Sequence, residues 1–303
     1  MTIGPYELND IYCGDSAVML AALPDACIDL TVTSPPYDNL RAYNGFSWDF
    51  TAIAIQLYRV TKPGGVVVWV VGDATVNGSE TGSSFRQALG FMDLGFNMET
   101  MIYKVKGTGA KGNDKYYWQA HEYMFVFSKG TPKTINLIMD KKNITAGGNS
   151  RGRHTREYAN GSVNPTNVKT AEYGRRDNVW EYQPGNDETG DHPAPFPEAL
   201  ARDHILSWSN PGDVVLDPFM GSGTVAKMSH LLDRHFLGFD ISDEYVSLAK
   251  RRVEAVMMQP KLFSWGAAHS AYGKTDSSKL NSQQNLPLPL SRNHEMELYD
   301  EPE

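Results

Sequence analysis

The pentapeptide TSPPY at residues 33–37 is the first place in the chain where residue types and spacing predict chemistry. Two consecutive prolines, Pro35 and Pro36, restrict the backbone and remove two N–H donors, which leaves carbonyl oxygens free to face a ligand. The Ser34 hydroxyl and the Pro35 carbonyl suit the hydrogens of an amino group, and Tyr37 offers a face for stacking a flat ring. The segment therefore predicts a site for an amino-group substrate, with an ordinary proline turn as the alternative.

The segment VVLDPFMGSGT at residues 214–224 is a second place where spacing predicts chemistry. An apolar run ends in Asp217, and the Gly-x-Gly turn at Gly221 and Gly223 then opens a helix, so the backbone can approach a ligand closely. The next apolar run ends about 20 residues later in Asp240, where doubly wound folds place a carboxylate that binds the hydroxyls of a ribose. Together these features predict a nucleoside ligand, while the turn alone could be any nucleotide loop or a tight strand-to-helix connection.

An alternating order of strands and helices is predicted to hold these residues. Apolar runs predict strands at 28–33, 65–71, 97–105, 123–127, 213–217 and 235–240. Helical spacing with end signals predicts helices at 49–60, 85–94, 196–209, 224–232 and 242–256. This order is typical of a doubly wound α/β fold, in which TSPPY and Asp217 both lie at the carboxyl ends of buried strands. The sequence assigns no role to four residues just before the strand at 123–127, namely Trp118, Gln119, His121 and Glu122.

One basic block stands inside an acidic protein. The formal net charge of the chain is −8, yet from Lys104 to Tyr182 fourteen Lys and Arg residues oppose seven Asp and Glu residues. The block as a whole favours nucleic-acid binding through phosphate and base contacts, whereas a solvated surface position is preferred for any single cation, such as Arg153 or Arg175. Aromatic side chains are interleaved with these cations at Tyr116, Tyr117, Trp118, Tyr158 and Tyr173.

The remaining composition excludes several protein classes. No apolar run reaches the roughly 18 to 20 residues that span a bilayer, and the first residues lack the basic and apolar regions of a signal peptide. The cytoplasm is therefore the expected compartment. Cys13 and Cys27 are too few for a disulfide framework and too far apart for a CxxC motif, so we expect neither disulfides nor a metal site.

Taken together, the motifs show that the chain resembles the amino-methyltransferase family of DNA methyltransferases, whose members belong to restriction-modification systems or act as orphan enzymes. The resemblance rests on TSPPY and DPFMGSGT, with YCGDS at 12–16 and HPAPFP at 192–197, and covers residues 6–256. The tetrapeptide precedes the cofactor loop, as in the β group of that family. The resemblance thus implies an α/β, permuted Rossmann-like methyltransferase fold with an inserted target recognition region.

The same resemblance implies an organisation and a set of partners. Residues 1–128 would form the catalytic half, 129–191 the basic target recognition insertion, and 192–258 the half that binds S-adenosyl-L-methionine. The polar tail at 259–303 is expected to be disordered. The implied partner is double-stranded DNA rather than a membrane, and members of the group also form homodimers or work beside a cognate restriction endonuclease.

Site residues carry over from the family one by one. The catalytic tetrapeptide matches Ser34, Pro35, Pro36 and Tyr37. For the methionine part of the cofactor the matching residues are Asp217, Phe219, Gly221, Ser222 and Gly223, with His192 beside them. Asp240 matches the acid that binds the ribose, and Asp15 matches the position that contacts the cofactor's adenine.

The implied activity is direct transfer of a methyl group to the exocyclic amino group of a flipped base. Such an amine is a weak nucleophile, and acceptors that bind its hydrogens favour a more pyramidal nitrogen, so catalysis depends on positioning and oriented dipoles. Ser34 favours the 4-amino group of cytosine, because adenine-specific members more often carry Asp or Asn there. Phe196, where many of those members have Lys, favours the same base. The 6-amino group of adenine, a protein or RNA amide, and a DNA-binding regulator without transfer activity remain alternatives.

Overall fold

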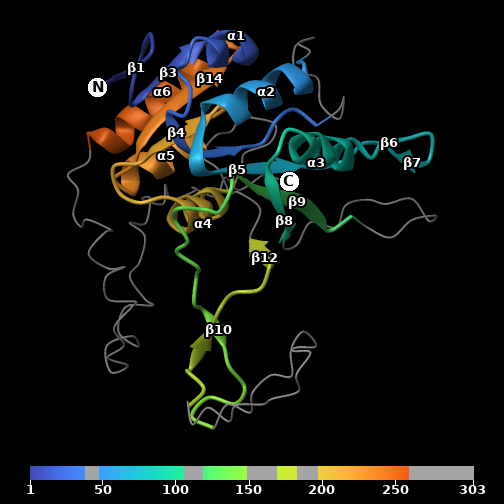
Figure 1. The fold of residues 1–303 in the computed structure, drawn as a ribbon. Helices are drawn as coiled ribbons and strands as arrows, with labels where there is room; N and C mark the ends of the chain where they lie inside the picture. Colours follow the sequence, from blue (N-terminus) through green and yellow to red (C-terminus); the bar gives the residue numbers. More distant parts are fainter. Residues whose placement is uncertain (38–47, 106–118, 149–168, 183–196, 259–303) are drawn as a thin grey trace, which may run out of the picture. The chain divides into compact units, whose positions relative to one another are not determined.

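The fold is built on an eight-stranded sheet (Figure 1), and the predicted site residues TSPPY and Asp217 lie at the ends of its strands. The structure is a computed structural model, and it describes residues 1–37, 48–105, 119–148, 169–182 and 197–258. The order of the strands across the sheet is β12 (Val179–Tyr182), β8 (Asn97–Val105), β9 (His121–Ser128), β5 (Thr61–Val71), β4 (Ile28–Thr33), β13 (Val214–Asp217), β14 (His235–Asp240) and β3 (Asp10–Cys13). Neighbours are parallel except where β9 pairs with β5 and with β8.

Helices cover both faces of this sheet, as expected for a doubly wound fold. One face packs against α1 (Ser16–Ala21), α2 (Phe50–Val60) and α3 (Ser83–Asp93). The other packs against α4 (Glu198–Trp208), α5 (Thr224–Leu231) and α6 (Asp243–Met257). Three two-stranded hairpins complete the described elements: β1 (Thr2–Ile3) with β2 (Tyr6–Glu7), β6 (Thr75–Val76) with β7 (Ser79–Glu80), and β10 (Lys141–Lys142) with β11 (Tyr173–Gly174).

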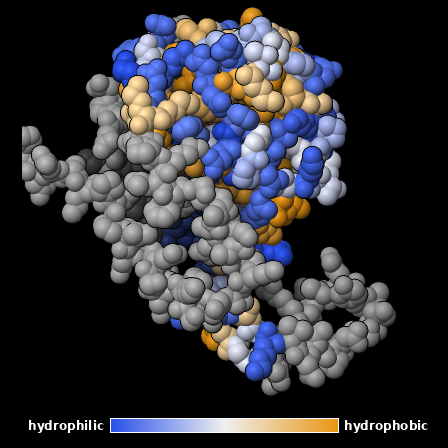
Figure 2. Space-filling model, turned by 90° about the vertical axis from the view of Figure 1, so that its left-hand side faces the viewer, coloured by the Kyte–Doolittle hydropathy of each residue, from blue (hydrophilic) through white to orange (hydrophobic). Residues whose placement is uncertain are grey.

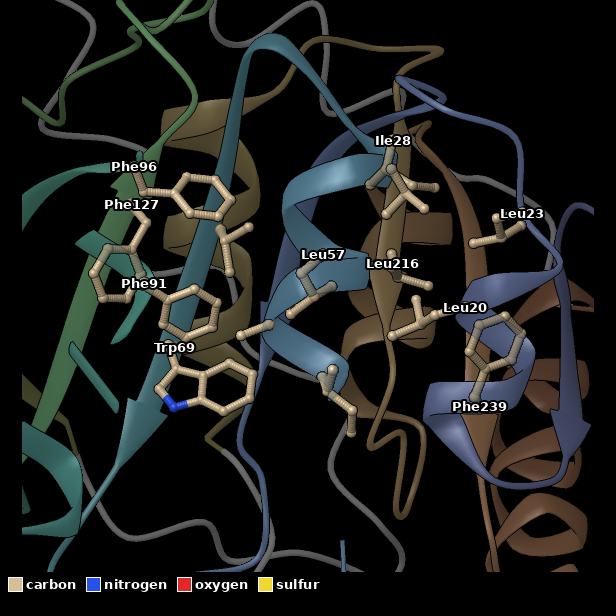
Figure 3. Close-up of a cluster of buried hydrophobic side chains, with 14 of the residues drawn as sticks. Leu20, Leu23, Ile28, Leu57, Trp69, Phe91, Phe96, Phe127, Leu216 and Phe239 are labelled. Atoms are coloured by element: carbon tan, nitrogen blue, oxygen red, sulfur yellow. The ribbon is translucent and has the colours of Figure 1, made fainter. Parts of the chain in front are cut away.

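An aromatic core holds α3 against the sheet beside the predicted site (Figure 3). The rings of Phe91 and Phe127 lie 4.6 Å apart, and those of Trp69 and Phe91 lie 5.1 Å apart. All three side chains are fully buried, and the one polar atom among them, the indole nitrogen of Trp69, donates to Gln87 at 2.8 Å. Burial of such large rings is among the strongest stabilising contributions to a core. This packing therefore joins the carboxyl-terminal half of β5 to α3.

The predicted elements are confirmed with small differences at their ends. The helix expected at 49–60 is α2, capped by Asp49, and the strand expected at 97–105 is β8 with the same bounds. No sequence pattern predicts α1, β3 or β12, which are short, and β3 and β12 mix polar and apolar residues. Strand β12 lies in the range 129–191, which was predicted to form the basic target recognition insertion. It nevertheless extends the main sheet beside β8, with Trp180 buried.

On the face that Figure 2 presents, hydrophilic residues are interspersed with hydrophobic ones. Among the described helices, none is long and apolar enough to cross a membrane. Cys13 and Cys27 are both free thiols. The tail at 259–303, predicted to be disordered, lies outside the described residues.

Candidate active site

The TSPPY segment and Asp217 are far apart in the sequence but lie next to each other at the centre of the sheet. Strands β4 and β13 are parallel neighbours, and from this point the strand order runs outward in both directions, through β5 on one side and β14 on the other. A hydrogen bond links the last residues of the two strands, in which Thr33 Oγ1 of β4 donates to Asp217 Oδ1 of β13 at 2.6 Å. Such a switch point is where open α/β sheets bind their ligands.

The tetrapeptide follows directly on β4. Ser34 and Tyr37 are partly buried and Pro35 is buried. The Tyr37 ring lies beside Gly72 at the carboxyl end of β5, where an added Cβ would be 3.4 Å from the ring. Burial, together with the nearby Glu122, raises the pKa of the Tyr37 hydroxyl well above its usual value. Tyr37 is therefore a neutral hydrogen-bond donor at any physiological pH.

The Asp217 carboxyl is buried at the base of the glycine loop. Its Oδ1 accepts hydrogen bonds from Thr33 and from the Phe219 amide, the latter at 3.0 Å. Among the described residues it forms no ion pair. Burial raises its pKa to about 7, even though both hydrogen bonds favour the charged form, and the charge of Asp240 adds to the rise. A buried carboxylate that has no ion-pair partner among the described residues is suited to a cationic ligand, because the cation would stabilise the charged form of the carboxyl.

Asp240 joins the loop to the next strand. One of its oxygens accepts from the Gly221 amide at 2.8 Å and the other from the Ser242 amide at 2.9 Å. Gly223, which caps α5, has a φ of +84°, and an added Cβ would lie only 2.8 Å from the Cβ of Ala249. Only glycine fits this position without strain. The loop is thus held close to the amino end of α5, a position that favours anionic or polar ligand groups.

Arg252 of α6 supports this loop through hydrogen bonds. This role of Arg252 was not predicted from the sequence. Its Nη1 donates to the Ser222 carbonyl at 2.6 Å and to the Ser222 hydroxyl at 2.9 Å. Glu198, at the start of α4, accepts from Arg252 at 3.2 Å and from Lys227 at 2.6 Å. No local sequence signal identifies Arg252, because the contact depends on how α6 packs against α5.

Arg252→Ala should weaken binding of the ligand held by this loop by about threefold to tenfold, since it deletes charge-assisted hydrogen bonds to a loop that keeps its other supports. Isothermal titration calorimetry with S-adenosyl-L-methionine, the cofactor that the resemblance implies, measures this change. The matched control is Arg251→Ala, which removes an exposed cation from the preceding position of the same helix. Equal affinities of the two variants would show that these hydrogen bonds are irrelevant to binding.

Asp15 is exposed and caps α1, with its carboxylate accepting from the Ala17 and Val18 amides. The next residue, Ser16, donates to the Pro218 carbonyl, so this segment adjoins the glycine loop. Phe219 in that loop packs against Trp48, with ring centroids 5.2 Å apart.

His192 lies outside the described residues. Glu122, to which the sequence assigns no role, accepts a hydrogen bond from Tyr37.

Comparison with known proteins shows which proteins this chain is similar to. The family model described as DNA methylase matches residues 28–251. The orphan methyltransferase M.BamHII from Bacillus amyloliquefaciens is 53% identical over 239 residues, covering 76% of this chain and 90% of the relative. The type II methyltransferase M.BglII from Bacillus subtilis is 32% identical, covering 80% and 68% of the two chains. The structure of TTHA0409 from Thermus thermophilus, complexed with S-adenosyl-L-methionine, has a TM-score of 0.56 at 25% identity and covers 83% of this chain and 97% of its own.

Proposed function

The chain belongs to the DNA methylase family and is an S-adenosyl-L-methionine-dependent DNA methyltransferase that acts on amino groups, and we propose that its target is the 4-amino group of cytosine. The observation that carries the choice of base is Ser34 at the head of the tetrapeptide, with its hydroxyl 3.0 Å from that of Tyr37. The family's adenine-specific members more often have Asp or Asn at this position.

The described residues fit the cofactor. Asp217 is buried, and no cation pairs with it in the described part of the chain, so the methionine ammonium group would neutralise it. Asp240, at the end of the neighbouring strand, would bind the ribose, and Asp15 would contact the adenine. When bound, S-adenosyl-L-methionine supplies a methyl group on a sulfonium, which an amine can attack without a covalent enzyme intermediate.

The tetrapeptide would hold the base that receives the methyl group. Ser34 would accept a hydrogen bond from the amino group, which increases the electron density on its nitrogen. Tyr37 would stack on the extruded base, as expected when chemistry on a base requires it to leave the duplex. The protein contributes position and oriented dipoles, which are sufficient for a direct displacement.

Product analysis tests the choice of base. The purified protein is incubated with methyl-labelled S-adenosyl-L-methionine and unmethylated DNA of mixed sequence, and the DNA is then hydrolysed to nucleosides for mass spectrometry. The expected product is deoxycytidine methylated on its 4-amino group. Deoxyadenosine methylated on its 6-amino group would overturn the base while keeping the activity.

The hairpin of β10 and β11 is proposed to contact DNA. Lys142, Lys169 and Arg175 are exposed there, whereas Arg176 is held at the base of the hairpin by Asp140 and Asp203. Tyr182 of β12 also donates to Asp203, at 2.9 Å. The hairpin is therefore anchored on α4, and its outer cations face solvent. Four of the five interleaved aromatic residues, at 116, 117, 118 and 158, lie outside the described residues, while Tyr173 is exposed on β11.

Lys142→Ala combined with Arg175→Ala should reduce DNA affinity similarly for all sequences and lower the slope of log K against log salt by about 2, because each lost phosphate contact removes about 1. Fluorescence anisotropy with labelled duplexes over a salt series measures the slope. Lys250→Ala, on α6 where Lys250 pairs with Asp10, is the control and should leave the slope unchanged. An unchanged slope in the double variant would remove the hairpin from the DNA interface.

A further inference from the structure

A chain of hydrogen bonds leads from Ser34 to a carboxylate that the cofactor site does not use. The hydroxyl oxygens of Ser34 and Tyr37 are 3.0 Å apart, and Tyr37 donates to Glu122 Oε2 at 2.8 Å. The same oxygen accepts from Tyr103 at 2.7 Å. Glu122 is partly buried and lies on β9, directly opposite Tyr103 of β8.

The chemistry of these groups determines the direction of every hydrogen bond in the chain. A carboxylate only accepts, so Tyr37 gives its single proton to Glu122. The Tyr37 oxygen can then only accept from Ser34, whose own proton is thereby committed to Tyr37. The Ser34 oxygen then has only its lone pairs available to a ligand. Ser34 therefore acts as a hydrogen-bond acceptor, which is the role needed to bind a hydrogen of an amino group.

The sheet register builds this arrangement. Val71 of β5 pairs with Tyr123 of β9, so Gly72 and Glu122 lie next to each other just beyond that pair. Without a side chain at Gly72, the Tyr37 ring fits against the end of β5 within hydrogen-bond distance of Glu122. The contact depends on β9 running antiparallel, because only then does the start of a strand lie at the same edge as the end of β5.

We propose that Glu122 is a positioning residue that orients Ser34 as an acceptor, and that its carboxylate receives the proton released by the methylated amino group. This inference rests on the proposed function, since it requires an amino-group substrate at Ser34, but it holds for cytosine and adenine alike. In the step, an N–H bond of the methylated ammonium breaks and its proton binds the Ser34 oxygen. The Ser34 proton moves to Tyr37, and the Tyr37 proton moves to Glu122. One positive charge on nitrogen and one negative charge on the carboxylate disappear together.

The test is a cycle of isosteric variants in single-turnover methyl transfer to DNA of mixed sequence, with total incorporated label as the readout. Glu122→Gln should slow transfer by about tenfold to a hundredfold, the lower part of the range for positioned proton acceptors. Tyr37→Phe keeps the ring and removes the connecting hydroxyl, so it should cause a similar loss. The double variant should be no slower than the slower single variant, because both changes interrupt the same chain.

A further readout separates this role from a structural one, because the loss should fall on the rate of transfer and not on cofactor binding. Calorimetric affinity for S-adenosyl-L-methionine should change by less than about twofold in either variant, because neither residue touches the cofactor loop. Tyr103→Phe is the matched control: it deletes a hydroxyl bound to the same oxygen but outside the chain to Ser34, and its loss should stay within about threefold.

The outcomes are distinct for the two proposals. A wild-type rate in Glu122→Gln, a cofactor affinity that falls together with the rate, or losses that multiply in the double variant would overturn the role of Glu122 and leave the methyltransferase activity intact. A wild-type protein that labels no DNA nucleoside would overturn both this role and the proposed function.

Discussion

Ser34→Ala should slow methyl transfer by about 100-fold to 1,000-fold in single turnover, the loss typical of removing one oriented dipole from a catalytic site. Ser34 would lie between Tyr37, whose hydroxyl is 3.0 Å from its own, and the base that receives the methyl group. Affinity for S-adenosyl-L-methionine should be nearly unchanged, since Asp217, the carboxylate proposed to face the cofactor, is held by Thr33 and the Phe219 amide instead. Rapid-quench kinetics with labelled cofactor measures the transfer step.

Ser207→Ala is the matched control for this substitution. Ser207 is a buried serine of α4, and its hydroxyl donates to the Asp203 carbonyl of the same helix at 2.7 Å. The control removes the same atom from a site remote from the tetrapeptide and should leave the transfer rate unaltered. If Ser34→Ala transferred methyl groups as fast as Ser207→Ala, the tetrapeptide mechanism would have to be abandoned.

Affinity for S-adenosyl-L-methionine should increase about tenfold per pH unit as the pH rises towards 7, and then level off. In the free protein burial raises the pKa of Asp217 to about 7, so below that pH the carboxyl is largely protonated. A cationic ammonium group favours the charged carboxylate, so binding must release this proton at lower pH. Calorimetry in buffers of different ionisation enthalpy should detect the released proton at pH 6 and not at pH 8.5.

The same shift in pKa predicts how the stability of the free protein depends on pH. A carboxyl whose pKa is raised in the folded state stabilises the fold fully below the unfolded pKa of about 3.9, and this contribution is lost as the pH rises through 7. The increase in melting temperature on adding cofactor should therefore be larger at pH 8 than at pH 6. Asp217→Asn should remove the pH dependence of binding and lower the affinity at pH 8. A wild-type affinity that is constant from pH 5.5 to 8 would contradict the assignment.

The part of the site that lies on single strand ends could be predicted from sequence. TSPPY and Asp217 each follow an apolar run long enough to identify as a buried strand, and a parallel sheet places such ends at one edge. The bond between Thr33 and Asp217 could not be predicted, because it requires β4 and β13 to be neighbours, and the order of strands is not encoded in the pattern of any one of them.

Residues that act through packing or register were beyond sequence reasoning for a related reason. Glu122 precedes an apolar strand as an ordinary polar residue would, and its importance comes from the antiparallel pairing that sets it beside Gly72. Arg252 lies on the helix α6 among other cations, and only the packing of α6 distinguishes it from the exposed Arg251. Strand β12 was missed because four residues between polar segments carry too little periodicity to identify.

The antiparallel strand also creates an opening for protein engineering. Strand β8 leaves the sheet at Val105 and β9 enters it again at His121, both at the edge where Ser34 and Asp217 lie. Because β8 and β9 are antiparallel, the end of β8 and the start of β9 lie on the same side of the sheet, so joining them does not need the crossover that parallel strands require. The sequence between these two strands could therefore be exchanged or lengthened without changing the order of the strands in the sheet.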